Sequence, residues 1–442
     1  MSLFHSRRHG CSIRGRAFVG ALVLTAAVLT APSASAYSVL THEGMVDAMW
    51  QPEIAPLLQQ RFGPLTSKQL AEARAYAYGG SLIQDLGYYP FGSRLFTDLM
   101  HYVRAGDFVE SLLAGATHVN EYAFALGALA HYNSDCAGHP LAVNRVVPMM
   151  YPKVRAKVGP DALYVDSPAR HVMVEFAFDV LQVARGAYVA QAYHDRIGFE
   201  VAKPLLERSV RATYGLELGD VLPNVDLAIG TYRRAVGTTI PELTRIAWRD
   251  KRDDIEKATP GVTAEKFVFV LSPADYDRQF GKNYRKPGLF SRILAFALKI
   301  LPKIGPLRPL AFEPLTPEAD ALLAESVAAS RVRYRATLRS LRSGPLRLPN
   351  TDFDTGRPPV RGVNRLADET YADLLHRLAG HEFAGVPPEL CRELNAFFGH
   401  ALPTNASLSR SRARRIERDL RAMNSEALTR SASAGRRHAG SP

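Results

Sequence analysis

The side chains best suited to chemistry lie in residues 117–140, which read THVNEYAFALGALAHYNSDCAGHP. His131, Asp135 and His139 are spaced four residues apart, and this spacing places all three along one face of an α-helix. Small and apolar residues surround them, so we expect that face to be buried. A buried carboxylate beside two imidazoles is costly unless a positive group satisfies it. A divalent cation would do so, and imidazole with carboxylate suits zinc.

Taken alone, this pattern also fits a hydrogen-bonded core histidine and an ordinary His–Asp ion pair four residues apart. Further metal-type side chains in mostly apolar helical surroundings favour the metal interpretation. His42 follows a plausible helix cap, His101 lies in the apolar stretch LFTDLMHYV, and His171 and Glu175 are again four residues apart. Asp85 is expected on a Pro/Gly/Tyr-rich loop, after a helix that ends at residues 79–80. Together these residues are hard to explain as packing.

The order of these residues resembles that of the bacterial zinc-dependent phospholipase C family and the related single-strand-specific zinc nucleases. The shared pattern is an N-terminal aromatic residue, a nearby His, a loop Asp, a His, then H-x-x-x-D with a further His, and finally H-x-x-x-(E/D). The resemblance covers residues 37–180 and extends to about 215. It implies a mainly α, multi-helix bundle that carries up to three Zn²⁺ ions.

The resemblance also implies the role of each residue. Asp85 would serve as the catalytic general base as well as a ligand, and Asp135 would bridge two metals. Tyr88 and Tyr89 could line a headgroup or base site, with simple loop packing as the alternative. The implied ligands, metal by metal, are Tyr37, His42 and Asp135; Asp85, His101, His131 and Asp135; and His139, His171 and Glu175.

Three features depart from the family pattern. The first residue would be Tyr37 where the family usually has Trp, although backbone ligation does not need an indole. His139 follows His131 by eight residues rather than ten. The five-residue step from Tyr37 to His42 resembles the nucleases, whereas Glu175 resembles the phospholipases.

Residues 1–36 have the pattern of an export signal peptide. Four Arg residues and no acid precede the apolar run AFVGALVLTAAVLTA, and an A-x-A cleavage site ends at Ala36. An uncleaved membrane anchor is the alternative. Cleavage would leave Cys136 and Cys391 in the mature chain, which is no disulfide framework. We therefore expect a secreted or periplasmic protein in which Cys136 is a small core residue.

The net charge of +12 is distributed unevenly. The signal segment contributes +4 and residues 405–442 contribute +6, which leaves +2 for residues 37–404. The folded part thus predicts no basic face for nucleic acid. We divide the mature chain into a phospholipase C-like helical domain at 37–215, a helical C-terminal region of unknown role at 216–404, and a disordered basic tail at 405–442.

The C-terminal region offers two recognisable segments. Residues 286–307, KPGLFSRILAFALKILPKIGPL, are cationic and strongly apolar, as in a helix that lies on a membrane surface. A core helix with Lys and Pro at its ends is the alternative. Residues 318–342 predict a long amphipathic helix, and the Pro/Gly/Asp-rich residues 343–364 predict a loop.

The most consistent interpretation is an exported zinc-dependent phosphodiesterase of the phospholipase C type, which would hydrolyse phospholipids with a metal-activated water. Two alternatives remain. The first is a single-strand nuclease that uses the same zinc cluster on nucleic acid. The second is a zinc-stabilised binding protein without catalysis. The sequence points to no protein partner.

Overall fold

The computed structural model describes residues 39–89, 91–184, 199–234, 248, 252–253, 256, 314–399 and 409–438. Within these ranges the chain is helical, and its only β-type pairing is an isolated antiparallel bridge between Asp352 and Arg357. The predicted mainly α fold is therefore confirmed.

The helices divide into four groups along the chain. The first group is α2 (Val39–Met49), the π-helical η1 (Trp50–Ile54), α3 (Ala55–Phe62), α4 (Ser67–Leu82) and the 3₁₀-helical η2 (Ile83–Tyr88). The second is α5 (Arg94–Tyr102), α6 (Ala105–Gly115), α7 (Val119–Gly138), the π-helical η3 (His139–Val143), α8 (Asn144–Met150) and α9 (Pro152–Val158). The third is the 3₁₀-helical η4 (Tyr164–Asp166), α10 (Pro168–Ala184), α12 (Lys203–Tyr214), α13 (Leu218–Val221) and α14 (Val225–Arg234). The last is α19 (Pro317–Ser340), α20 (Arg365–Gly380), α21 (Pro388–Gly399) and α22 (Arg410–His438).

Helices α4 and α7 cross at backbone contact because a glycine on each helix lies against the backbone of the other. A Cβ atom on Gly80 would lie 1.8 Å from the Phe124 carbonyl oxygen, and one on Gly127 would lie 1.9 Å from the Ala77 carbonyl oxygen. The sequence predicted that the helix would end at residues 79–80, but α4 continues to Leu82. Gly80 lies inside α4 and Gly127 inside α7, because any side chain at either position would force the two helices apart.

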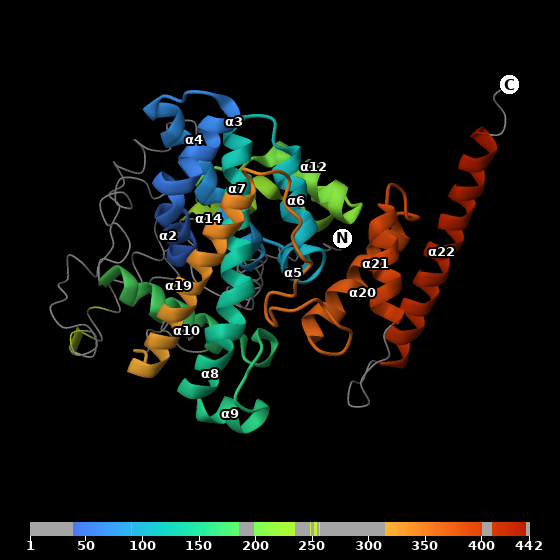
Figure 1. Ribbon diagram of the computed structural model, residues 1–442. Helices are drawn as coiled ribbons and strands as arrows, with labels where there is room; N and C mark the ends of the chain where they lie inside the picture. Colours follow the sequence, from blue (N-terminus) through green and yellow to red (C-terminus); the bar gives the residue numbers. More distant parts are fainter. Residues whose placement is uncertain are drawn as a thin grey trace, which may run out of the picture.

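Helix α19 from the C-terminal region packs along α7 (Figure 1). It begins with a capping Thr316 and ends at Ser340, close to the predicted range of 318–342. The Tyr334 hydroxyl donates to the Leu126 carbonyl over 2.8 Å, and the Thr337 hydroxyl donates to Asn133 over 3.1 Å. Buried residues before and after position 215 belong to one hydrophobic cluster, so the two predicted parts share a core.

The prediction of a disordered tail from residue 405 does not hold for residues 410–438, which form α22. Ile416, Asp419 and Met423 are buried and lie on one side of that helix, at helical spacing. Asp419 accepts from His376 of α20 over 3.1 Å, and α22 lies against α20 (Figure 1). The basic composition concealed this stripe because Arg and Ser dominate the rest of the segment.

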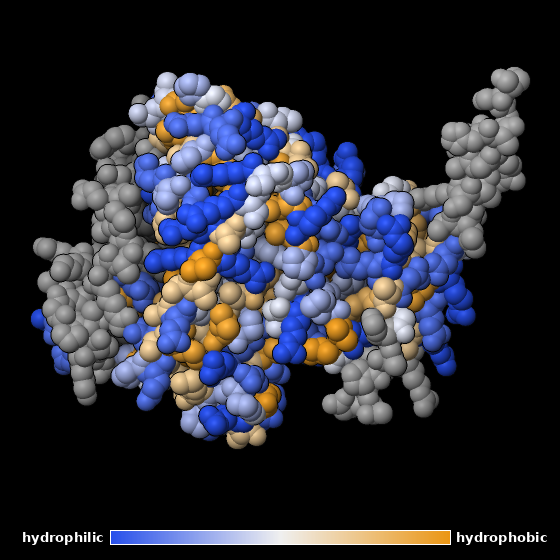
Figure 2. Space-filling view, viewed as in Figure 1, coloured by the Kyte–Doolittle hydropathy of each residue, from blue (hydrophilic) through white to orange (hydrophobic). Residues whose placement is uncertain are grey.

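No helix among the described residues is long and apolar enough to cross a membrane. Figure 2 shows hydrophilic residues spread over the visible face, with apolar residues in small groups between them. Residues 1–36 and 286–307, for which the sequence predicts an export signal and a membrane-surface helix, lie outside the described residues.

Candidate metal centre

Asp135 lies at the centre of the candidate site. It is fully buried on α7, and its two carboxylate oxygens face different imidazoles. Oδ1 is 3.5 Å from Nε2 of His42, while Oδ2 is 3.1 Å from Nε2 of His131 and 3.6 Å from Nε2 of His101. A carboxylate with this placement can bridge two metal ions.

Three other elements bring further partners to Asp135. His42 comes from α2, and its ring stacks on that of His131 with centroids 4.2 Å apart. His101 ends α5, and Asp85 lies on η2 directly after α4. Asp85 Oδ1 is 3.4 Å from His101 Nε2, and Asp85 Oδ2 is 3.9 Å from His42 Nε2. The close α4–α7 crossing thus positions η2 against the metal-type face of α7.

Backbone carbonyls orient two of these imidazoles. Nδ1 of His131 is 2.9 Å from the Ser81 carbonyl oxygen, and Nδ1 of His101 is 2.9 Å from the Thr97 carbonyl oxygen. A carbonyl oxygen only accepts, so each Nδ1 donates its proton and each Nε2 is turned towards the carboxylates. This arrangement, with Nδ1–H held by a carbonyl, is typical of metal-ligating histidines.

His139, His171 and Glu175 form a separate buried group, in which one ligand atom of each lies within 4.8 Å of the others. The sequence predicted His139 on the same helical face as His131 and Asp135. It instead begins the π-helical η3, directly after α7 ends at Gly138. A π-helical turn is wider than an α-helical one, and such turns are frequent at functional sites. This change turns His139 towards His171, whose ring centroid is 6.1 Å away.

Burial controls the protonation of the second group. Burial lowers the pKa of His171 to about 3, aided by the neighbouring His139, and lowers the pKa of His139 to about 4. Both imidazoles are therefore neutral at pH 7 and offer lone pairs. Burial, together with the negative charge of Asp135 and Asp85, raises the pKa of Glu175 well above its ordinary value. A cation beside Glu175 would reverse that shift.

The first group shows opposing shifts. Burial would lower the pKa of His101, but the nearby carboxylates of Asp135 and Asp85 outweigh it and raise that pKa to about 10. Burial, with the nearby His131, lowers the pKa of His42 to about 4. Burial opposes ionisation of Asp135, yet His131 and His42 hold the pKa of its carboxyl well below the usual range.

The donor set fits zinc. Nε2 of His101 and of His131, and both oxygens of Asp135, are buried without a hydrogen bond, as are Nδ1 of His171 and Oε1 of Glu175. Two ligands bound to a tetrahedral zinc at about 2.1 Å lie roughly 3.4 Å apart. The N···O separations around Asp135, from 3.1 to 3.6 Å, bracket this value. A metal ion would satisfy atoms that have no other partner.

The structure brings together eight of the nine predicted ligands, and Tyr37 lies outside the described residues. Tyr88 is buried beside the site, its ring edge-on to His101 at 6.0 Å and tilted against Tyr164 at 6.1 Å. Tyr89 instead stacks on Tyr232 of α14 at 3.9 Å. That contact is the loop packing kept open as the alternative. Substrate binding by either tyrosine stays a prediction.

Sequence reasoning missed residues that surround the site. Asp179 lies one turn after Glu175 on α10 and accepts from the backbone N–H groups of Leu40 and Thr41 at 2.8 and 3.2 Å. It thereby fixes the start of α2, just before His42. Asp354 and Phe353 come from the loop between α19 and α20. Their only signal was the acidic stretch TDFDTG inside an expected loop, which has no helical spacing.

The chain also contains a cavity of about 520 Å³ away from the metal groups. Helix α6, the end of α12 and the segment from 341 to 347 line it, with Arg61, Arg104 and Arg347 among the lining residues. None of the lining residues belongs to a metal group.

Three buried His/Asp/Glu groups in this mainly α-helical fold could each hold a metal ion, as multi-zinc hydrolases do. Residues 42–222, somewhat less than half of the chain, match the family model described as zinc dependent phospholipase C. This part of the chain is therefore similar to the zinc-dependent phospholipase C family, which is an enzyme family, and the match supports a hydrolase function. Searches of curated proteins and of solved structures found no significant match.

Proposed function

We propose that the protein is an exported phosphodiesterase that cleaves phospholipids in the manner of a phospholipase C. The observation that carries the proposal is Asp135, whose Oδ1 faces the imidazole of His42 while its Oδ2 faces those of His131 and His101. Such a shared carboxylate holds two cations close together, as phosphodiester cleavage by paired metals requires. The family match over residues 42–222 supports the same class of substrate.

We assign the ligands as the resemblance implied them. Zinc at these positions would activate water for attack on the phosphorus and neutralise the phosphate oxygens. Asp135 would bridge two of the ions, and Asp85 would ligate one of them. The proposed ligands of the three ions are Tyr37, His42 and Asp135; Asp85, His101, His131 and Asp135; and His139, His171 and Glu175.

The side chains around these ligands would contribute orientation and proton transfer. Ser81 and Thr97 hold His131 and His101 in the tautomer that directs Nε2 inwards. Asp85, with its oxygens 3.4 Å from His101 and 3.9 Å from His42, would accept the proton of the attacking water as general base. Tyr88, buried against His101, excludes water from that side.

Export and the N-terminus are linked in this proposal. Signal cleavage after Ala36 would expose the amine of Tyr37, five residues before His42. Asp179 anchors residues 40 and 41 beside α10, so a chain that starts at Tyr37 would have its amine within about 15 Å of Leu40. A free amine is deprotonated easily enough near neutral pH to bind a metal.

The processing step can be tested directly. One preparation would begin at Tyr37, and the second would keep additional residues before it. We expect the extended form to bind one zinc fewer and to lose most of its activity. An extended form with full zinc content and full activity would remove Tyr37 from the ligand set.

The substrate class requires a side-by-side comparison. The mature protein and its Asp135→Asn variant would be incubated with phosphatidylcholine vesicles and with single-stranded DNA. We expect lipid cleavage that depends on Asp135, with little or no DNA cleavage, since residues 37–404 carry a charge of only +2. DNA cleavage without lipid turnover would identify a nuclease, which the Tyr37–His42 spacing favours. Zinc-loaded protein that cleaves neither substrate would be a binding protein.

A further inference from the structure

The C-terminal region places a carboxylate beside the metal group of His139. Asp354 lies on the loop between α19 and α20, far outside the matched residues 42–222. Its side chain is buried, and its Oδ1 is 3.6 Å from Nδ1 of His139. The charge of Asp354 also acts on Glu175, the third member of that group. Asp354 therefore lies beside a metal group whose residues are distant from it in the sequence.

Several hydrogen bonds fix the position of Asp354. The Tyr102 hydroxyl donates to its Oδ2 over 3.2 Å, and the Asn364 amide donates to the same oxygen over 3.3 Å. The Asn144 amide donates to its backbone carbonyl over 2.7 Å. Each of these donors acts on atoms other than Oδ1, so Oδ1 remains directed towards His139.

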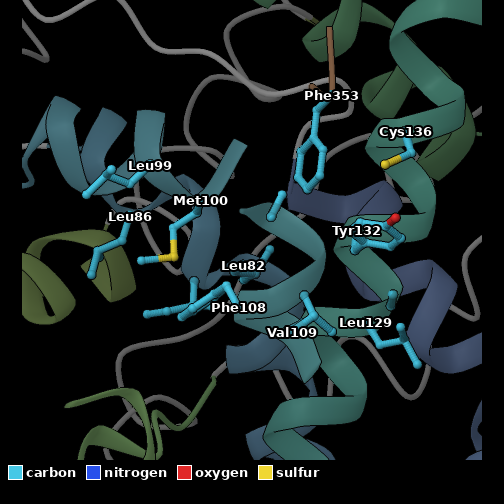
Figure 3. Close-up of a cluster of buried hydrophobic side chains, with 14 of the residues drawn as sticks. Leu82, Leu86, Leu99, Met100, Phe108, Val109, Leu129, Tyr132, Cys136 and Phe353 are labelled. Atoms are coloured by element: carbon cyan, nitrogen blue, oxygen red, sulfur yellow. The ribbon is translucent and has the colours of Figure 1, made fainter. Parts of the chain in front are cut away.

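The neighbouring Phe353 attaches the same loop to the first metal group. Its backbone N–H donates to the carbonyl of His101 over 3.1 Å. Its ring lies 5.0 Å from that of His101 and 5.7 Å from that of Tyr132. Figure 3 shows Phe353 in the same apolar cluster as Tyr132 and Leu82. The loop is thus part of the wall of the site, held at two points.

The distance between Asp354 Oδ1 and His139 Nδ1 is that of two ligands of one metal ion rather than that of a hydrogen bond. At 3.6 Å it is too long for a hydrogen bond, and Nδ1 of His139 is buried without any hydrogen-bond partner. Two ligands of one tetrahedral zinc are roughly 3.4 Å apart. His139, His171 and Glu175 supply three ligand atoms, and a tetrahedral zinc has a fourth position that a further side chain or a water can take.

We infer that Asp354 is a further ligand of the metal held by His139, His171 and Glu175, so that the C-terminal region completes the zinc cluster. This inference rests on the proposed zinc site. The C-terminal region would then have a role in metal retention as well as in the core.

The test is Asp354→Asn in the full mature chain, with zinc as the probe. The amide keeps the size of the side chain and can still accept from Tyr102 and Asn364. Its NH₂ group can donate to the lone pair of His139 and so stabilise the metal-free protein. We expect the variant to lose one zinc about 10- to 100-fold more readily to a chelator. We also expect its melting temperature to be lower than wild type with zinc, and equal or higher without zinc.

Asp352→Asn is the matched control. Asp352 lies on the same loop, is equally buried, and accepts from Asn364 over 3.0 Å and from the N–H of Thr355 over 3.2 Å. Its variant should change the melting temperature by the same amount with and without zinc, and should keep wild-type zinc retention.

The outcomes separate the inference from the proposed function. If wild type binds zinc and Asp354→Asn retains it equally well, the inference is wrong and the zinc site stands. If wild type binds no zinc, both the site and the inference fail. If Asp354→Asn does not fold, Tyr102→Phe decides, because it removes the hydrogen bond to Oδ2 alone. Faster zinc loss in Tyr102→Phe supports the inference, and unchanged zinc retention contradicts it.

Discussion

The two regions that build the metal centre do so by different means. In the N-terminal region, residues 42–222, most of the proposed ligands lie on helices, and two His–acid pairs are four residues apart. In the C-terminal region, the contribution comes from the irregular loop that carries Phe353 and Asp354, within the described residues 314–399. Both contributions lie at buried positions beside the same imidazoles. The comparison shows that helical spacing reveals a ligand set only where the ligands share a helix.

Apolar packing and ion pairs both join the two regions. Leu338 of α19 is fully buried in the same hydrophobic cluster as Leu129 of α7. Ion pairs at the surface add to this contact, as between Glu53 of η1 and Arg339 of α19. If apolar packing dominates, removing a core side chain of α19 should cost far more stability than removing an exposed charge.

The largest effect is expected for Asp135→Asn, which tests whether the N-terminal region supplies the chemistry. Loss of the shared negative charge should remove at least one zinc and lower hydrolysis by about 1,000-fold or more, equivalent to about 4 kcal/mol. Metal content and the initial rate would be measured together. Asp107→Asn, a carboxylate of α6 outside the metal groups, is the control and should have wild-type metal content.

The next effect concerns the shared core. Leu338→Ala should lower the free energy of unfolding by about 3 kcal/mol, because it leaves a cavity in a buried cluster. Denaturant unfolding should still show one transition. Val332→Ala, on the same helix but 70% exposed, should change stability by less than about 0.5 kcal/mol. A separate transition for the C-terminal region would show that the two regions do not fold together.

The smallest effect is expected for Arg339→Gln. The Arg339 guanidinium donates to Glu53 over 2.9 Å, but its side chain is 64% exposed. Arg342 contacts the same carboxylate at 3.0 Å and remains in the variant. We expect a loss of less than about 1 kcal/mol in unfolding free energy. A loss of several kcal/mol would mean that the ion pairs, and not the apolar packing, join the regions.

Residue spacing predicted much of the N-terminal site. The pairs His131/Asp135 and His171/Glu175 each share a helix, so periodicity alone placed their side chains together. His139 was misplaced relative to that face because a π-helical turn follows Gly138, and side-chain patterns do not reveal a single wider turn. The resemblance, rather than spacing, supplied the grouping of His139 with His171.

The rest could not be predicted because it depends on tertiary contacts. Asp354 reaches His139 through a loop whose path follows from the packing of α19 and α20. Glycine is unfavourable inside a helix, so Gly80 and Gly127 are unexpected at their positions in the sequence alone. Only the close crossing of α4 and α7 explains them. Helix α22 was missed because three buried side chains stand among many Arg and Ser residues.

The central claim is that zinc occupies these buried groups, and metal analysis of the purified mature protein tests it most directly. We predict two to three zinc ions per chain. Chelation should lower the melting temperature, because a ligand that binds only the folded state stabilises it by about 4 kcal/mol at 1,000 times its Kd. Adding zinc back should restore both stability and hydrolysis. A metal-free protein with unchanged stability and unchanged hydrolysis would contradict the claim.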